Sequence, residues 1–294
     1  MELRHLRYFL AAAREGNMTR AAASCHVSQP ALSRQLGDLE RELGCELFVR
    51  ASRGVTLTEE GMLLRKRAEE IVDLADRAEL ELRTDGAQIE GDVWVGAGES
   101  RVLDVVAHAM ARLGTEQPGV RLRLYSGNAE DVVERVDKGL LDFGVLLGHE
   151  VDRRFESLDL GWCDSWGVLM RRDHRLCDRT SLTLDELAGE RLIVSAQRHI
   201  DETDGGLVER VTSLGIPVVA TYTLLYNASL LVERGVGVAV CFEGIVAAGE
   251  GTPFAFVPLT DLPEVRAMLV WKRFQPMSRA AQLFLRMIRD EQSD

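Results

Sequence analysis

The segment Thr19-Arg-Ala-Ala-Ala-Ser-Cys-His-Val-Ser28-Gln-Pro-Ala-Leu-Ser-Arg-Gln-Leu-Gly-Asp-Leu-Glu40 decides the fold of the first part of this chain. We expect Thr19 to cap a short helix of small residues and Ser28 to cap a second helix. Pro30 falls in the first turn of the second helix, where the missing N–H of proline costs little. The segment therefore predicts two helices joined by a tight turn.

The second of these helices has two different faces. Its leucines recur at spacings of four, three and four residues, so at roughly 100° per residue they form one stripe: Leu32, Leu36, Leu39 and Leu43. The opposite face is small, polar and cationic, and such a face can lie in the major groove of DNA. An ordinary packed helical hairpin is the alternative that this spacing leaves open. The predicted DNA contacts are Thr19, Arg20, Ser28, Gln29, Pro30, Ser33 and Arg34.

Two short strand-like runs follow, at residues 46–50 and 54–58, joined by residues 51–53. This pattern is typical of the wing of a winged helix. Arg50 and Arg53 then lie at its tip, where they would reach the DNA backbone or the minor groove, although each arginine alone is equally compatible with a solvated charge.

Matched positions in register across this region identify a family. They are Ala21-Ala22, Val27 to Leu36, Leu39-Glu40, Leu43-Gly44, Leu47-Phe48, Arg50, Arg53, Thr56-Leu57-Thr58 and Gly61. On these residues the segment resembles the N-terminal domain of the LysR-type transcriptional regulators. Cys25 departs from the leucine that the family usually has, which suggests a slightly underfilled core.

Residues 59–87 contain no proline and predict one long helix. Six apolar residues recur with a heptad period: Leu64, Ala68, Ile71, Ala75, Ala78 and Leu82. The resemblance implies a linker helix that joins two DNA-binding heads into a homodimer, which would bind a partly palindromic site. Packing of this seam against the protein's own body is the alternative.

The rest of the chain alternates strands and helices. We expect strands at 92–97, 120–125, 143–147, 191–195, 218–221, 236–241 and 265–271, and helices at 101–113, 131–138, 206–214, 228–233 and 278–289. The first three strands read as βαβαβ, a parallel sheet with right-handed crossovers. Two such α/β lobes resemble the effector domain of the same regulators, which has the architecture of a type II periplasmic binding protein.

The expected fold is therefore multidomain. A mainly α winged helix-turn-helix head would occupy 1–58, a linker and dimerisation helix 59–88, a first effector lobe 91–161 plus 266–294, and a second effector lobe 162–265.

A ligand in such a fold binds between the lobes, at the carboxyl ends of strands and the N-termini of helices. The candidate effector-binding residues are Ser100, Arg101, Ser126, Asn128, Ser195, Gln197, Tyr226, Asn227 and Phe242. Three of them are candidate N-caps, Ser100, Asn128 and Asn227, and three converging helix N-termini favour a carboxylate or another anion. Glu99 and Glu243 oppose that preference, and each cap also has a structural role.

The charge is distributed unevenly. The chain carries a net charge of −12, yet residues 1–58 hold eight arginines and six acidic residues, a balance of +2. A basic head on an acidic body suits DNA binding, because the body repels phosphate. Hydrophobic content of 46% and charged content of 28% are ordinary for a soluble globular protein. No run approaches the roughly 20 apolar residues of a membrane span, so we expect a cytoplasmic protein with no membrane partner.

Other chemistry finds little support in the sequence. The five cysteines are widely spaced without a Cys-x-x-Cys pair, so neither a disulfide framework nor a zinc site is indicated. The six histidines have no metal-ligand spacing. Arg101 stands where a dinucleotide fingerprint needs its third glycine. We expect no metal, no cofactor and no enzymatic activity.

Three functional hypotheses remain. The first is a ligand-responsive regulator whose partners are double-stranded DNA, a small-molecule effector, further copies of itself as a homodimer or homotetramer, and RNA polymerase. The second is a thiol-based redox regulator on the same scaffold, with Cys163 and Cys177 as the candidate pair. The third is an enzyme or solute-binding protein with an incidental helix-turn-helix, which lacks a catalytic constellation and an export signal.

Overall fold

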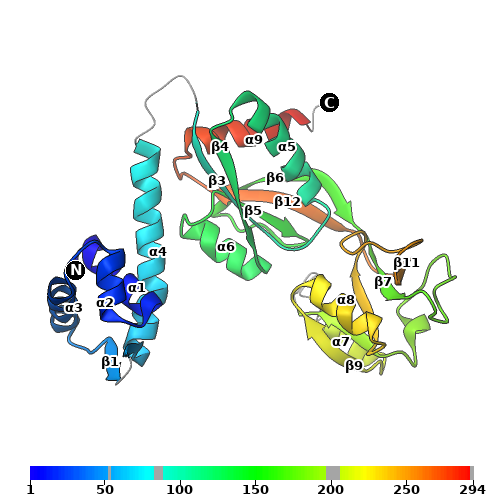
Figure 1. Ribbon diagram of the computed structural model, residues 1–294. Helices are drawn as coiled ribbons and strands as arrows, with labels where there is room; N and C mark the ends of the chain where they lie inside the picture. The colour runs from blue at the N-terminus through cyan, green and yellow to red at the C-terminus, as the bar shows by residue number, and fades with distance from the viewer. Residues whose placement is uncertain (52–53, 83–88, 197–205, 292–294) are drawn as a thin grey trace. The chain divides into compact units, whose positions relative to one another are not determined.

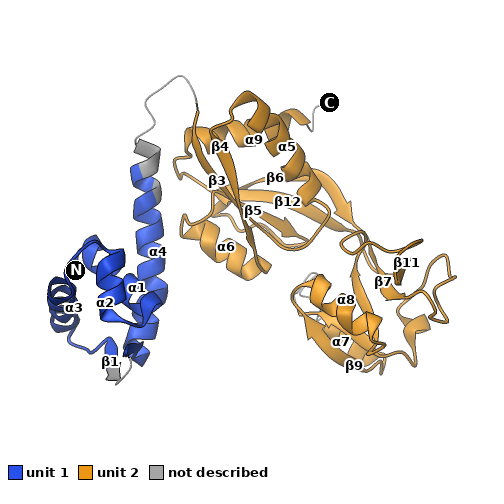
Figure 2. Ribbon diagram, in the orientation of Figure 1, with its two compact units in different colours: residues 1–85 blue, residues 86–294 orange. Residues whose placement is uncertain are grey.

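The computed structural model of the chain describes residues 1–51, 54–82, 89–196 and 206–291 (Figure 1). The chain divides into two compact units, residues 1–85 and residues 86–294 (Figure 2). The division falls near the end of the range predicted for the long helix, 59–88, so the head and most of that range form one unit and the two α/β lobes form the other.

Unit 1 is a small helical domain with a hairpin. Its elements are α1 (Leu3–Glu15), α2 (Met18–Ser24), α3 (Gln29–Leu43), β1 (Phe48–Ala51), β2 (Gly54–Leu57) and α4 (Glu59–Leu82). The predicted stripe is confirmed at Leu32, Leu36 and Leu39, which are buried with Leu6 and Phe9 in one core. The stripe is wrong at its end, because Leu43 is 40% exposed in the last turn of α3.

The caps of the two central helices differ from the prediction in one case. Ser28 occupies the N-cap position of α3 and Pro30 lies in its first turn, as predicted, but the Ser28 side chain makes no capping hydrogen bond. Thr19 is not a cap: α2 begins at Met18, and the side chain of Asn17 accepts hydrogen bonds from the amides of Thr19 and Arg20 at 2.9 and 3.1 Å. Asparagine is as good a cap as threonine, and here it comes first in the chain.

The wing hairpin is held by close backbone contacts. β1 and β2 pair antiparallel, with Phe48 opposite Leu57. Gly54 has φ +146°, and a Cβ placed there would lie 2.3 Å from the carbonyl oxygen of Gly16. The amide of Val55 donates to that same oxygen at 3.0 Å. A glycine is therefore needed at 54 for the hairpin to dock on the end of α1.

Helix α4 divides the predicted heptad seam between two environments. Leu64, Ala68 and Val72 pack into the core of unit 1 against the other helices, which is the alternative considered for this seam. Ile71 is 41% exposed and Ala78 is also exposed, while Ala75 is half-buried. Leu82 ends the helix, and its side chain lies outside the described part of the structure.

The first lobe of unit 2 is a five-stranded sheet in the order β4-β3-β5-β12-β6. Its strands are β3 (Gly91–Ala97), β4 (Val120–Ser126), β5 (Phe143–Leu147), β6 (Phe155–Asp164) and β12 (Val265–Lys272), and its helices are α5 (Leu103–Glu116), α6 (Ala129–Asp137) and α9 (Arg279–Glu291). β4, β3 and β5 are parallel as predicted, while β12 runs antiparallel between β5 and β6. α5 and α9 pack into one core with the sheet and α6 into another.

The second lobe has a five-stranded sheet in the order β11-β7-β10-β8-β9. Its strands are β7 (Trp166–Arg171), β8 (Leu192–Ser195), β9 (Val218–Tyr222), β10 (Val238–Phe242) and β11 (Phe254–Pro258), with the short helix η1 (Asp185–Leu187) and helices α7 (Gly206–Ser213) and α8 (Leu225–Glu233). β10 pairs parallel with β8 and β8 with β9, so the carboxyl ends of these strands share one edge.

The sequence prediction missed β6, β7 and β11. These strands carry the chain between the lobes: it leaves the first sheet after Asp164 and returns to it at Val265. β6 pairs with β12, a strand about a hundred residues later in the chain, so its existence depends on a distant partner. Helix α8 begins at Leu225, three residues before the predicted start, which places Asn227 inside the helix and not at its cap.

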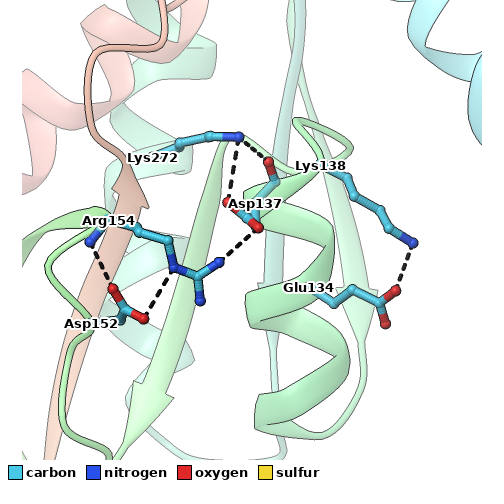
Figure 3. A network of polar contacts seen from close by, with 6 residues as sticks. All are labelled: Glu134, Asp137, Lys138, Asp152, Arg154 and Lys272. Carbon is cyan, nitrogen blue, oxygen red and sulfur yellow. Dashed lines mark hydrogen bonds and ion pairs between the residues drawn. The ribbon is translucent and has the colours of Figure 1, made fainter.

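A polar network fixes α6 to the first sheet (Figure 3). Asp137, the last residue of α6, forms an ion pair of 2.8 Å with Arg154 and contacts Lys272 of β12 through its carbonyl and carboxylate oxygens. Arg154 also pairs with Asp152 at 3.0 Å. These partly exposed pairs stabilise by about 0–1 kcal/mol each, so the apolar face of α6 remains its main anchor.

Candidate functional site

The first candidate surface is the N-terminal part of α3. Ser28, Gln29, Pro30 and Arg34 are exposed there, and Ser33 is half-buried. The Arg34 Nε lies 3.4 Å from the carbonyl oxygen of Pro30, a long contact that leaves the guanidinium available to another acceptor. The buried leucines on the opposite side fix the helix, so these polar groups are presented on a rigid element.

Helix α2 adds a second cationic group to this part of unit 1. Thr19 and Arg20 are exposed, and Arg20 donates to the carbonyl oxygen of Glu15 at 2.6 Å. That contact and an ion pair of 3.6 Å with the Glu15 carboxylate hold the guanidinium near the N-terminus of α2. The side chain of Arg50 and the whole of Arg53 lie outside the described residues.

A supporting residue that sequence reasoning missed is Glu40. Its Oε1 accepts the amide N–H of Leu47 at 2.8 Å and that of Phe48 at 3.3 Å. This carboxylate on α3 therefore fixes the start of the wing relative to the helix. Glu40 is one of the positions that carry the family resemblance, which indicates a role. The spacing of these positions does not reveal which backbone groups its carboxylate binds.

The second candidate site is a cleft between the lobes of unit 2. It is a narrow cleft lined by Gly98, Glu99, Leu147, Trp166, Ser195, Tyr222, Thr223, Leu225, Phe242 and Ile245. Of the predicted effector-binding residues, Ser195 and Phe242 line it, at the carboxyl ends of β8 and β10. The rings of Trp166 and Phe242 lie 4.2 Å apart, so the cleft has a largely aromatic and apolar wall.

Glu99 crosses this cleft. The amide N–H of Leu225, the first residue of α8, donates to the Glu99 carboxylate. Leu224, the N-cap residue of α8, provides no side-chain hydrogen bond of its own. A carboxylate from the first lobe thus supplies the cap for a helix of the second lobe. From the sequence, Glu99 was interpreted only as a negative charge that opposes the binding of an anion.

Ser100 follows Glu99 in the chain and contacts the end of β6. Its hydroxyl donates to Asp164 at 2.5 Å and accepts the amide of Val102 at 2.9 Å. Asp164 is 3% exposed and also accepts the indole N–H of Trp162 at 3.0 Å. Burial raises the pKa of the Asp164 carboxyl despite these two donors. Ser100 therefore ties the turn that carries Glu99 to the end of β6.

The remaining predicted effector residues do not line the cleft. Asn128 caps α6, accepting the amide of Asp131 at 2.7 Å. Ser126 is exposed at the end of β4, and Tyr226 and Asn227 are exposed on α8. Arg101 is exposed, with its stem against Gly244. Gln197 lies outside the described residues.

The thiols give the redox hypothesis little support. Cys163 is exposed on β6. Desolvation and the neighbouring Asp178 raise the pKa of the Cys177 thiol, and burial raises the pKa of Cys241 to about 12. A reactive cysteine needs a lowered pKa, so neither of these environments favours a thiolate.

The described residues offer neither a metal site nor a membrane-spanning helix. Within residues 1–51, 54–82, 89–196 and 206–291, His, Cys, Asp and Glu side chains form no group of three placed to hold a metal ion. Within the same ranges, the helices are too short or too polar to cross a membrane.

Comparisons with known proteins agree for both units. Residues 3–62 match the family described as bacterial regulatory helix-turn-helix protein, lysR family, and residues 86–293 match the LysR substrate binding domain. The uncharacterized HTH-type transcriptional regulator YnfL of Escherichia coli K12 is 28% identical over 97% of this chain and 96% of its own. The Hca operon transcriptional activator HcaR of the same strain is 28% identical over 99% and 98%. The crystal structure of full-length CbnR with its target DNA covers 99% of both chains with a TM-score of 0.76 and 21% identity, a likeness of fold.

Proposed function

Because the chain belongs to the LysR family of bacterial transcriptional regulators, we propose that it binds partly palindromic promoter sites through α2 and α3 and responds to a small molecule in the interlobe cleft. One observation supports the DNA-binding part most directly. The N-terminal face of α3 exposes Gln29 and Arg34 while its leucines are buried on the other side. Such a helix can enter a major groove with its polar groups toward the base edges.

The roles of the DNA contacts divide by chemistry. Gln29 and Arg34, near the start of α3, read base edges, because amide and guanidinium groups pair with adenine and guanine in the major groove. Ser28 and Arg20, with Thr19, bind phosphates and set the register of the helix. Pro30 and Ser33 lie between these groups and contact sugar or methyl groups. Arg50 and Arg53 of the wing contribute phosphate or minor-groove contacts.

Dimerisation uses the outer face of α4. Leu63, Ile71 and Leu74 are 67%, 41% and 45% exposed, and with Ala78 they form one stripe. At 100° per residue this stripe lies about 100° around the helix from the residues that pack into the core. A second copy of α4 would bury it, and the effector domains would extend the dimer to a tetramer. Of the predicted seam, Ile71 and Ala78 belong to this outer face.

The chain acts as a regulator without catalysis, in the cytoplasm where promoter DNA lies. Ligand binding between the lobes shifts their arrangement, and the linker helices transmit that shift to the spacing of the heads, which RNA polymerase then senses. A ligand can act this way only to the extent that it binds one arrangement better than the other.

Selection of DNA from a random duplex pool by the full-length protein tests this proposal. We expect enrichment of partly palindromic sequences by the wild type and loss of that enrichment by Arg34→Ala. Arg41→Ala is the matched control, because Arg41 is an exposed arginine at the other end of α3, paired with Asp38. Uniform binding of all sequences by the wild type would contradict the proposed function.

A further inference from the structure

The described residues that line the interlobe cleft include one acidic side chain and no basic one. Among the described residues that line the cleft, Glu99 is the only one with a carboxylate or a basic group. The others are apolar, aromatic, hydroxyl-bearing or glycine. The tyrosine among them, Tyr222, donates its hydroxyl to the carbonyl oxygen of Val240 at 2.8 Å. Burial raises the pKa of that phenol well above its usual range, so it stays neutral.

Glu99 already occupies the position that an anionic ligand would use. The N-terminus of a helix attracts anions because its first amides have no partner within the helix. At α8 the first amide, that of Leu225, donates to the Glu99 carboxylate. A ligand carboxylate placed beside it would meet a like charge at close range. Repulsion between like charges about 4 Å apart near a protein surface weakens binding by roughly tenfold or more.

The other nearby charges lie outside the described lining of the cleft. Glu243 follows Phe242 and is exposed, which adds a second negative charge near the rim. Asp164 is buried behind Ser100 and holds its hydrogen bonds internally. Arg101 is the nearest cation in sequence, but it is exposed, is not among the lining residues, and lays its stem over Gly244.

The apolar wall suits the body of an organic ligand. Trp166 and Phe242 are 2% and 5% exposed and their rings pack on each other with centroids 4.2 Å apart, and Leu147 and Ile245 complete the apolar lining. A positively charged head group beside this wall gains attraction from the Glu99 carboxylate. We propose that Glu99 makes this cleft selective for an organic ammonium ligand with an apolar or aromatic body. This inference rests on the proposed function of the cleft as the effector site.

Two probes of the same shape and opposite charge test the inference: phenethylammonium and 3-phenylpropionate, titrated calorimetrically into the full-length protein. We expect the wild type to bind the ammonium at least about tenfold more tightly than the carboxylate. Glu99→Gln keeps an oxygen that accepts the Leu225 amide but removes the charge, so this variant should lose the preference. Glu243→Gln is the control and should keep it.

A second variant separates charge from helix capping. Glu99→Asp retains the charge on a shorter side chain, and we expect it to retain the preference for the ammonium even if the cap of α8 is weakened. A wild type that prefers the carboxylate, or a Glu99→Gln variant that keeps the wild-type preference, would overturn the inference. Absence of binding by both probes would overturn it too, whereas sequence-selective DNA binding by the same preparations would leave the regulator function standing.

Discussion

Replacing Glu40 by alanine should loosen the wing from the recognition helix. The carboxylate accepts two amides, and their residues Leu47 and Phe48 are 1% and 8% exposed, so water cannot fully replace it. Each unsatisfied buried amide costs about 1–3 kcal/mol, and the longer 3.3 Å bond falls at the low end. We expect a loss of about 2–4 kcal/mol in the free energy of opening this region.

Hydrogen exchange of the full-length protein measures this loss at the amides concerned. Glu40→Ala should accelerate exchange in the segment that contains Leu47 and Phe48, and Glu40→Gln, which keeps a neutral acceptor, should give an intermediate rate. Glu46→Ala is the matched control, because Glu46 is a neighbouring exposed glutamate that contributes its backbone carbonyl to Thr58. If the segment that contains Leu47 and Phe48 exchanges at the same rate in Glu40→Ala and Glu46→Ala, the Glu40 carboxylate does not hold the wing and the reasoning is refuted.

Three further outcomes are expected. Arg34→Ala should lose about 1–3 kcal/mol of affinity for a selected duplex and much less for random DNA, measured by fluorescence anisotropy; equal losses on both would exclude base reading. Leu74→Asp should raise the dissociation constant of the dimer at least tenfold in analytical ultracentrifugation. Glu69→Ala, on the other side of α4, should leave it unchanged. An unchanged mass for Leu74→Asp would show that the outer face of α4 does not form the dimer interface. Burial raises the folded-state pKa of Asp164, so the wild type binds that proton more tightly than the unfolded chain does. Wild-type stability should therefore fall as pH rises through the raised pKa, and urea unfolding of Asp164→Asn should lack this fall, worth about 1.4 kcal/mol per pKa unit; parallel profiles would contradict the assignment.

Local signals predicted the recognition helix well. Ser28 and Pro30 mark its start, and three of four leucines face the core, because residue preferences at helix starts and the helix period are properties of neighbouring residues. The strand at Phe143–Leu147 was predicted with its bounds, since a strand buried on both faces is a continuous apolar run. The prediction that Thr19 caps α2 was wrong because another capping residue, Asn17, lies two positions earlier.

Period alone does not say which partner an apolar stripe meets. The heptad reading of α4 grouped Ala68 with Ile71, yet Ala68 is fully buried within unit 1 and Ile71 is 41% exposed. The helix carries two neighbouring apolar faces. A heptad pattern, which alternates spacings of three and four residues, takes residues from both faces and counts them as one stripe. The distinction needs the position of α1, which packs on one face and leaves the other.

The cleft was predicted least well, for a physical reason that bears on its ligand. Ser195 and Phe242 were found because strand ends can be located from buried runs. The expected anion preference rested on counting helix N-termini as unoccupied positive sites. At α8 that site is satisfied by Glu99, a residue 126 positions earlier in the chain and in the other lobe, and Asn227 lies inside the helix. Because a helix N-terminus carries only about half a positive charge and the Glu99 carboxylate a full negative one, the net charge of the described lining is negative, and the ligand's own charge should be opposite to the one that the sequence favoured.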